Sequence, residues 1–397
     1  MSDDHKSSNT SLRHLIEERF RSNLQSKQKR QARRRLETRR AQHAAAKRLQ
    51  EGIESNKAVV AVRRKLKSEA RGKTARVKER TSRFELLVPE TLDLFTEYDQ
   101  TARFLAGIRD IALRKRRNVQ LIFDDAKNIH PGAMLCLVSE CYRCRNIDSK
   151  NPRVSGNYPA DPRIKRILQD IGFFDLLEVH NPLPLQSDNF PLEYIKVFSG
   201  NRAVGEQADR LKAALLGDAI QMDPAASTKL YRGLTEAMTN VVHHAYPSEI
   251  SSGVARLKNR WWLVGHVDKD KRELMVMFFD QGVGIPATLP LRYPGEYLNT
   301  ILAGLHLLDP NDGDLIRAAM RITRSQTSES HRGRGLNDFR AFINECGGGS
   351  LRIISRRGLY TYTADGNETS AALKVNLGGT LIEWTVPLES ISNWRGD

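Results

Sequence analysis

The distribution of charge along the chain most constrains what it can fold into. Residues 1–85 hold 25 Lys and Arg against 10 Asp and Glu, whereas residues 86–397 hold 38 against 37. Almost all of the net charge of +16 therefore belongs to the first 85 residues. Apolar residues are too sparse there to form a buried face. A packed core is expected only from about Phe84, where FELLVPETLDLF is the first segment of high apolar density.

The basic segment, residues 1–83, is expected to be a solvated arm. It has no Pro and is rich in Ala, Arg, Lys, Gln and Glu, which favour helices. We expect one or two long helices, or a disordered arm that becomes helical when bound. Clustered Lys and Arg favour phosphates, so nucleic acid is the natural partner, bound through its backbone and without sequence preference. A solubilising or oligomerising tail is the alternative.

The remaining composition is typical of a cytoplasmic protein with two or three domains. The chain has 397 residues, and no apolar run approaches the ~20 residues needed to cross a bilayer. Its first ten residues are polar and acidic, unlike a signal peptide. Four cysteines do not make a disulfide framework in a chain of this length. Cys141 and Cys144 are interpreted as two thiols one turn apart on a helix, with a zinc or redox pair as the alternative.

Residues 84–189 alternate between strand and helix patterns, which favours a small α/β domain. Helical spacing of apolar residues predicts helices over 101–114, 132–145 and 162–177, and NVQLIF (118–123) is typical of a buried strand. This strand, continued as NVQLIFDDAKNI and followed by a helix beginning HPGAM, resembles the STAS domain of anti-sigma-factor antagonists. Regulated members carry a phosphorylatable Ser at that helix start, whereas residues 129–133 here have no hydroxyl. The resemblance therefore implies a fixed docking module for a protein partner, and a generic α/β domain is the alternative.

Four short motifs follow in order along the last 165 residues. They are Glu236-x-x-x-Asn240 in LTEAMTNVVHHAY, Asp280-x-Gly282-x-Gly284 in FFDQGVGIP, Gly333-x-Gly335-Leu336 in HRGRGLNDF, and Gly379-Thr380 in LGGTLIEW. Each motif is common when seen alone, so only the combination of all four, in this order, indicates a function.

The first motif is predicted to lie on a helix over residues 228–246. Its apolar stripe, at steps of three and four, consists of Leu230, Leu234, Ala237, Val241 and Ala245. Glu236 and Asn240 share the other face, and His244 follows one turn later. A row of carboxylate, amide and imidazole suits the wall of a site. A surface helix with its polar residues in solvent is the alternative.

The second motif follows a predicted strand over residues 273–279, apolar on both faces. Asp280 at the strand end can accept a hydrogen bond from the exocyclic amine of adenine, which guanine lacks at that position. Gly282 and Gly284 would let the backbone pass close to the base and ribose. A glycine-rich turn capped by Asp is the alternative.

The third motif, Arg332-Gly333-Arg334-Gly335-Leu336, precedes a predicted helix over 337–346 that three glycines end. Such a backbone presents N–H groups to phosphate oxygens, and Arg332 and Arg334 add charge that could reach a γ-phosphate. No P-loop lysine is present. The stretch 293–330 is expected to contain a lid over a nucleotide. Strands are predicted over 351–355, 359–363 and 377–386, the last carrying Thr380.

Together, in this order, the motifs resemble the ATP site of the GHKL family, which includes gyrase, the ninety-kilodalton heat-shock chaperone, histidine kinases and mismatch-repair clamps. The resemblance covers about residues 190–397 and implies a Bergerat-type α/β sandwich that binds ATP and Mg²⁺. It implies that Asn240 holds Mg²⁺ through its amide oxygen and that Glu236 is the general base. His244 would belong to the same site wall.

The resemblance also assigns the remaining motif residues. Asp280 would read adenine beside Gly282 and Gly284, Thr380 would support the adenine site, and residues 332–336 would contact the phosphates. Family members often form homodimers, so the resemblance allows one here. The expected architecture is α/β, with an arm over 1–83, a STAS-like domain over 84–189 and a GHKL domain over 190–397.

Several roles for ATP remain open. We favour an ATP-gated switch or slow ATPase whose basic arm presents or releases nucleic acid. An anti-sigma-type Ser/Thr protein kinase is the main alternative, because EAMTNVVHHAYP is closest in wording to that branch. A histidine kinase is disfavoured, since no phosphoacceptor-helix pattern is present. A module that binds ATP without turnover is a further alternative. A regulatory or defence role in a bacterium would fit any of these.

Overall fold

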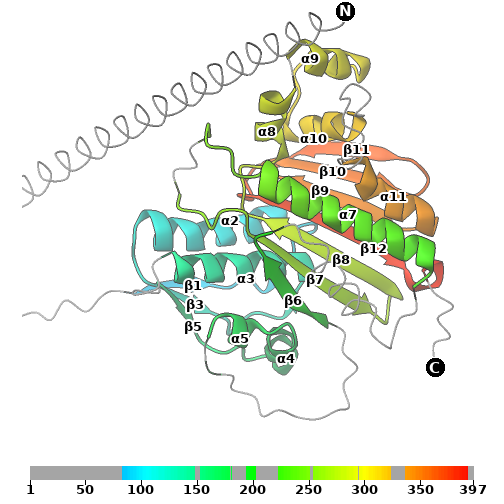
Figure 1. Ribbon diagram of the computed structural model, residues 1–397. Coiled ribbons are helices and arrows are strands. Elements are labelled where there is room, and N and C mark those ends of the chain that lie inside the picture. The colour runs from blue at the N-terminus through cyan, green and yellow to red at the C-terminus, as the bar shows by residue number, and fades with distance from the viewer. Residues whose placement is uncertain are drawn as a thin grey trace, which may run out of the picture. The chain divides into compact units, whose positions relative to one another are not determined.

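The computed structural model describes residues 83–147, 153–178, 180, 194–202, 222–250, 254–293, 295–322 and 336–391. All of them belong to one unit of the chain, Thr81–Asp397. Within them the fold is mixed α/β, as the sequence predicts, with parallel and antiparallel sheets (Figure 1). Apart from Arg83, the predicted basic arm lies outside the described residues, as does the predicted boundary between residues 189 and 190.

The N-terminal region of the unit contains short parallel sheets and the helices beside them. Its elements in chain order are β1 (Phe84–Leu87), β2 (Thr91–Leu92), α2 (Tyr98–Arg109), a π-helical turn η1 (Asp110–Arg114), β3 (Val119–Ile122), β4 (Asn128–Ile129), α3 (Pro131–Asn146), β5 (Val154–Gly156), α4 (Pro162–Asp170) and α5 (Phe173–Leu176). One sheet has the order β1-β3-β5, and β2 pairs with β4. The alternating strand and helix pattern predicted for this region is confirmed.

One predicted helix in this region was wrong. The apolar spacing over residues 162–177 predicts a single helix, but α4 ends at Asp170 and α5 begins at Phe173. Gly172 between them has a left-handed backbone, with φ of 76°. A residue in that conformation ends a helix, and the apolar spacing does not register this break.

The C-terminal region is built on a seven-stranded antiparallel sheet with the order β11-β10-β9-β12-β8-β7-β6. Its strands are β6 (Tyr194–Gly200), β7 (Trp261–Asp268), β8 (Glu273–Asp280), β9 (Ser350–Ser355), β10 (Gly358–Thr363), β11 (Glu368–Ala372) and β12 (Thr380–Pro387). The strands predicted at 273–279, 351–355 and 359–363 are confirmed. The one predicted at 377–386 begins later, at Thr380.

Helices cover both faces of this sheet. Helices α7 (Pro224–His243) and α11 (Asn337–Cys346) lie side by side across one face (Figure 1), and α3 packs against β7 and β8 from the other. Successive side chains of a strand point to opposite faces. Accordingly Val276 and Phe278 of β8 join the core beneath α7, whereas Met277 and Phe279 join the core beneath α3. This two-sided burial explains why ELMVMFF shows no polar alternation.

The stretch predicted to contain a lid is largely helical where it is described. Within it lie helices α9 (Gly295–Gly304) and α10 (Asp312–Arg321), which share a small apolar core with the preceding helix α8 (Ile285–Arg292). A capping box begins α10, in which the Asn311 side chain accepts from the Asp314 backbone and the Asp314 carboxylate accepts from the Asn311 backbone. Residues 323–335 lie outside the described residues.

Helix α7 differs from its prediction at both ends. It begins at Pro224, because the Asp223 carboxylate accepts hydrogen bonds from the backbone of Ala225 and Ala226. It ends at His243, so His244 caps the helix rather than lying within it. No helix among the described residues has both the length and the apolar character to cross a membrane.

The C-x-x-C pair lies on helix α3, as interpreted from the sequence. All four cysteines of the described residues, Cys136, Cys141, Cys144 and Cys346, are buried and free. Burial raises the pKa of the Cys144 thiol to about 12. These thiols therefore stay protonated near neutral pH and behave as small apolar side chains.

Candidate functional site

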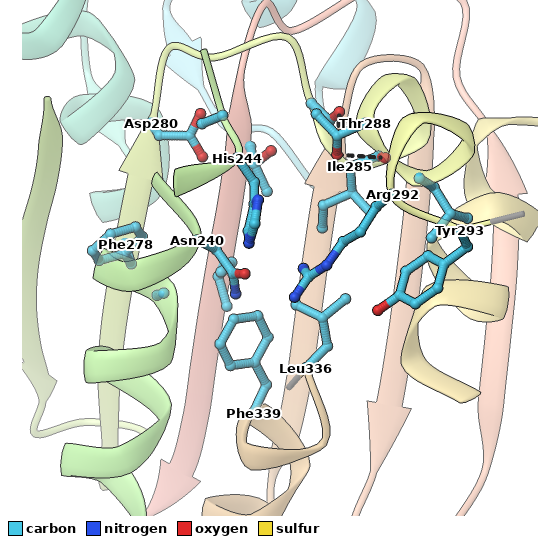
Figure 2. Close-up of a pocket in the computed structure, with 16 residues that line it drawn as sticks. Asn240, His244, Phe278, Asp280, Ile285, Thr288, Arg292, Tyr293, Leu336 and Phe339 are labelled. Carbon is cyan, nitrogen blue, oxygen red and sulfur yellow. Dashed lines mark hydrogen bonds between the residues drawn. The ribbon is translucent and has the colours of Figure 1, made fainter. Parts of the chain in front are cut away.

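A pocket lies where α7, the end of β8, α8, the start of α11 and the start of β12 meet (Figure 2). It is a hollow open to solvent and lined mostly by apolar side chains. Six residues predicted from the sequence line it, namely Asn240, His244, Asp280, Gly284, Leu336 and Thr380. They come from four segments far apart in the chain, and the fold brings them together.

Asp280 ends β8 at one side of the pocket and is only 6% exposed. The backbone N–H of Gly282 donates to its Oδ1 at 2.6 Å. Burial raises the pKa of this carboxyl to about 7, and the Gly282 hydrogen bond, the charge of Arg256 and a hydrogen bond with Thr380 only partly oppose the rise. Near neutral pH this carboxyl group is therefore partly protonated and partly ionised.

A pair of buried hydroxyls supports Asp280 from the neighbouring strands. Thr380 pairs with Asp280 across β12 and β8, and the Thr380 Oγ1 lies 2.9 Å from the Oγ of Ser355 on β9. The same Ser355 Oγ accepts from the backbone N–H of Ile285, the first residue of α8, at 2.9 Å. Ser355 was not predicted from the sequence. Its only signal was a hydroxyl at the end of the strand segment LRIIS.

The glycines of the second motif allow the strand end to pass close to α7. The backbone N–H of Val283 donates to the carbonyl of Ala245 at 2.9 Å. A Cβ on Gly282 would lie 2.4 Å from that carbonyl oxygen, and Gly284 has a φ of 90°. Neither position accepts another residue without a backbone shift. Gly284 lines the pocket, whereas Gly282 acts from behind it, through its hydrogen bond to Asp280.

Helix α7 supplies one wall of the pocket. Asn240 and His244 both project toward it (Figure 2). The Asn240 Nδ2 donates to the Glu236 Oε1 at 3.1 Å, so this contact uses the amide nitrogen and not the Oδ1. Glu236 itself is 5% exposed and does not line the pocket. The expectation that Glu236 and Asn240 share one face of the helix agrees with this contact, whereas the role of Glu236 as general base stays a prediction.

The pocket also contains residues to which the sequence analysis gave no role in the site. Most of them form apolar walls: Ala237, Phe278, Ile285, Leu289, Phe339 and Ile382. Apolar strands and helices gave no signal that distinguished these positions from ordinary core.

Arg292 is the most informative polar residue that was not predicted. It ends α8, and its side chain extends into the pocket toward Leu336, with Tyr293 beside it (Figure 2). No carboxylate among the described residues forms an ion pair with it. Its position on the helix that follows Asp280-x-Gly282-x-Gly284 is the signal that could have identified it.

Only some of the residues predicted to bind phosphate or metal lie among the described residues. Arg332, Gly333, Arg334 and Gly335 lie outside the described residues, whereas Leu336 lines the pocket beside the first turn of α11. Within the described residues, no group of three or more His, Cys, Asp or Glu side chains could hold a metal ion. A cation in this pocket would need ligands from a bound molecule in addition to the Asn240 amide.

No protein-family model matches this chain, and no curated protein matches it in sequence. The fold and the pocket are therefore the observations from which a function can be inferred.

Proposed function

We propose that residues 190–397 form a GHKL-type ATP-binding domain and that the protein is a Mg-ATP-dependent switch or slow ATPase. One observation carries the proposal. Residues from four separate sequence motifs line a single pocket on the sheet. A chance set of surface motifs would not be expected to converge in this way.

The Asp280 side of the pocket suits an adenine base. The apolar side chains of Phe278, Ile285 and Ile382 offer a surface for a flat ring, and Asp280 supplies an acceptor among them. The exocyclic amine of adenine would donate to this carboxyl and favour its ionised form. Guanine presents a carbonyl at the same position and would face the carboxylate with an acceptor.

The opposite side of the pocket suits a polyphosphate. The first turn of α11 lines it through Leu336 and Phe339, and the N-terminus of a helix favours anions. Arg292 adds a guanidinium without an anionic partner among the described residues. Asn240 would share Mg²⁺ with the phosphates, and the ion would neutralise charge on the transferred group.

Glu236 would act on the nucleotide indirectly, through Asn240. Its carboxylate accepts from the Asn240 amide, and this contact orients the Asn240 Oδ1. In this role Glu236 positions the metal ligand, and it becomes the general base only if a water can reach its carboxylate in the nucleotide-bound state. Slow turnover is the expected consequence.

The experiment that tests the proposal is titration calorimetry of ATP with Mg²⁺, with phosphate release measured on the same samples. Wild type is compared with Asp280→Asn, with Asn240→Ala and with Asp268→Asn, a control at the end of the adjacent strand β7. We expect Asp280→Asn to abolish binding, Asn240→Ala to remove its dependence on Mg²⁺, and Asp268→Asn to change neither.

Each outcome decides an element of the proposal. ATP affinity unchanged in Asp280→Asn would refute the assignment of the adenine site. Binding without phosphate release would redirect the search to a protein acceptor, as in an anti-sigma-type kinase, or to a nucleotide with a structural role. The proposed nucleic-acid role of residues 1–83 depends on charge alone and is tested separately.

A further inference from the structure

Helix α3 belongs to the core of both regions of the described unit. Almost all of its residues are buried. The ring of Tyr142 on α3 meets that of Trp262 on β7 edge to face, with centroids 5.0 Å apart. Near the start of α3, a Cβ on Gly132 would lie 3.3 Å from the side chain of Leu381 on β12. The N-terminal α/β region is therefore packed on the sheet that carries the pocket.

A buried ion-pair network lies within this contact. Glu140 on α3 is 1% exposed and accepts from the Nε and Nη2 of Arg109, the last residue of α2, at 3.1 and 2.7 Å. Arg143 pairs with the other carboxylate oxygen of Glu140. Burial alone would raise the pKa of Glu140, but the two arginines outweigh burial and lower it. The network therefore fixes the Arg109 guanidinium in one orientation.

Arg109 also holds the turn that leads into the pocket. Its Nη2 donates to the carbonyl of Leu377 at 2.8 Å, and the Tyr98 hydroxyl on the same helix donates to the carbonyl of Val375 at 2.7 Å. Gly378 has a φ of 86°, and a Cβ there would lie 2.1 Å from the Arg109 Nη1. The turn therefore packs in close contact with the Arg109 guanidinium.

On its other side the same turn touches Asp280. A Cβ on Gly379 would lie 1.9 Å from the Asp280 carbonyl oxygen, and Thr380 follows immediately as the partner of Asp280 across the strands. Close contacts therefore run without a gap from Arg109 through the turn to Asp280. A shift of the turn would move the Thr380 hydroxyl relative to the Asp280 carboxyl.

We propose that Arg109 and Tyr98 of helix α2 are positioning residues for base recognition, because they hold the turn Val375–Gly379 so that Thr380 and Asp280 face the base. This inference rests on the proposed function. The N-terminal α/β region then supports the nucleotide site directly and is not a separate module. A partner that displaced α2 would weaken base recognition, and nucleotide would in turn oppose that displacement.

The decisive measurement is the ratio of the affinities for ATP and ITP. The two nucleotides share ribose and phosphates, but ITP carries a carbonyl in place of the exocyclic amine. Loss of general stability changes both affinities together, whereas misplacement of Asp280 and Thr380 lowers the preference for ATP. Circular dichroism confirms that each variant is folded at the titration temperature.

Two variants and one matched control address the two contacts. Tyr98→Phe removes only the hydroxyl that donates to Val375, and we expect the ATP-to-ITP ratio to fall about fivefold, as for loss of one hydrogen bond. Arg109→Lys keeps a positive charge beside Glu140 but cannot also hold Leu377 through the same planar group, so a fall of about tenfold or more is expected. The control, Tyr362→Phe, removes a 2.6 Å hydrogen bond to Asn344 on α11 and should leave the ratio unchanged.

The outcomes separate this inference from the function on which it rests. If Asp280→Asn does not affect ATP binding, the proposed site itself fails. If Asp280→Asn abolishes binding while Tyr98→Phe and Arg109→Lys keep the wild-type ratio, the site stands and the positioning role is overturned. If Arg109→Lys does not fold, Tyr98→Phe decides. A fall of the ratio in Tyr362→Phe would also overturn the inference, because the effect would not be specific to the α2 contacts.

Discussion

Replacing Asp280 by Asn should make the stability of the nucleotide-free protein less sensitive to pH between about pH 4 and pH 7. Burial raises the pKa of this carboxyl from 3.8 to about 7. Between these two values the folded protein keeps a proton that the unfolded chain has lost, so its stability falls as pH rises from about 4 to about 7. Above pH 7 this contribution is constant. Asn has the same shape, stays neutral and still accepts from the Gly282 N–H, so it avoids the penalty.

The magnitude follows from the size of the shift. Each pKa unit corresponds to about 1.4 kcal/mol, and about two of the three units lie between pH 5 and pH 7. Wild type should therefore lose about 3 kcal/mol more unfolding free energy than Asp280→Asn between pH 5 and pH 8. No correction for solvent screening is needed because the carboxyl is buried.

Urea denaturation followed by tryptophan fluorescence at pH 5 and pH 8 measures this difference. Asp268→Asn is the matched control at the end of β7. Burial would raise the pKa of Asp268, but hydrogen bonds from Lys271 outweigh burial and lower it. Asp268 is thus ionised in both states over this range, and its replacement should shift stability equally at both pH values. Parallel pH profiles of wild type and Asp280→Asn would refute the reasoning about the buried carboxyl.

The same titration should appear in ligand binding. If adenosine binds the ionised form of Asp280, its affinity should rise about tenfold between pH 6 and pH 8, because the ionised fraction rises about tenfold around a pKa of about 7. Adenosine is the suitable ligand, since it lacks phosphates that titrate in this range. An affinity independent of pH would show that the base does not require the carboxylate.

Three further predictions concern other segments of the chain. Glu236→Gln should preserve the contact with Asn240 and bind ATP normally, but release phosphate at least about a hundredfold more slowly, as for loss of a general base; unchanged release would exclude that role. Arg292→Ala should weaken ATP binding by about tenfold and leave adenosine binding unchanged, as for loss of one charge-assisted phosphate contact, whereas an equal loss for both ligands would place Arg292 at the base. Deletion of residues 1–83 should preserve ATP binding and remove salt-sensitive binding of nucleic acid, and retained binding by the truncated chain in fluorescence anisotropy would locate the interaction elsewhere.

Periodicity along the sequence was sufficient for most of the secondary structure near the pocket. The helix over 337–346 and the strands over 351–355 and 359–363 were predicted within one residue of their observed bounds. They are regular segments with an apolar face, and their ends carry glycines or turn residues. Such local signals act over a few residues and need no partner segment to be recognised.

Long-range packing explains the features that local spacing did not indicate. The spacing of α7 places Glu236 with Asn240 on a polar face, yet packing of the surrounding elements buries Glu236. Ser355 contacts the pocket residue Thr380 because β9 pairs with β12, and Arg292 lines the pocket because α8 lies beside it. Neither arrangement produces a pattern within the segment that carries the residue.

Composition and local spacing were enough to locate the end of the basic charge, the start of the core and the α/β alternation. Such properties can be recognised from residues that are close together in the sequence. The resemblance of four short motifs to a known family pointed to six residues that share one pocket. Three features became visible only in the folded chain. They are the burial of α3 between the two regions, the hydrogen bonds from Arg109 and Tyr98 to the turn before Thr380, and a pKa near neutrality for Asp280. Those features arise from contacts between residues up to 277 positions apart, and from the desolvation that such contacts produce.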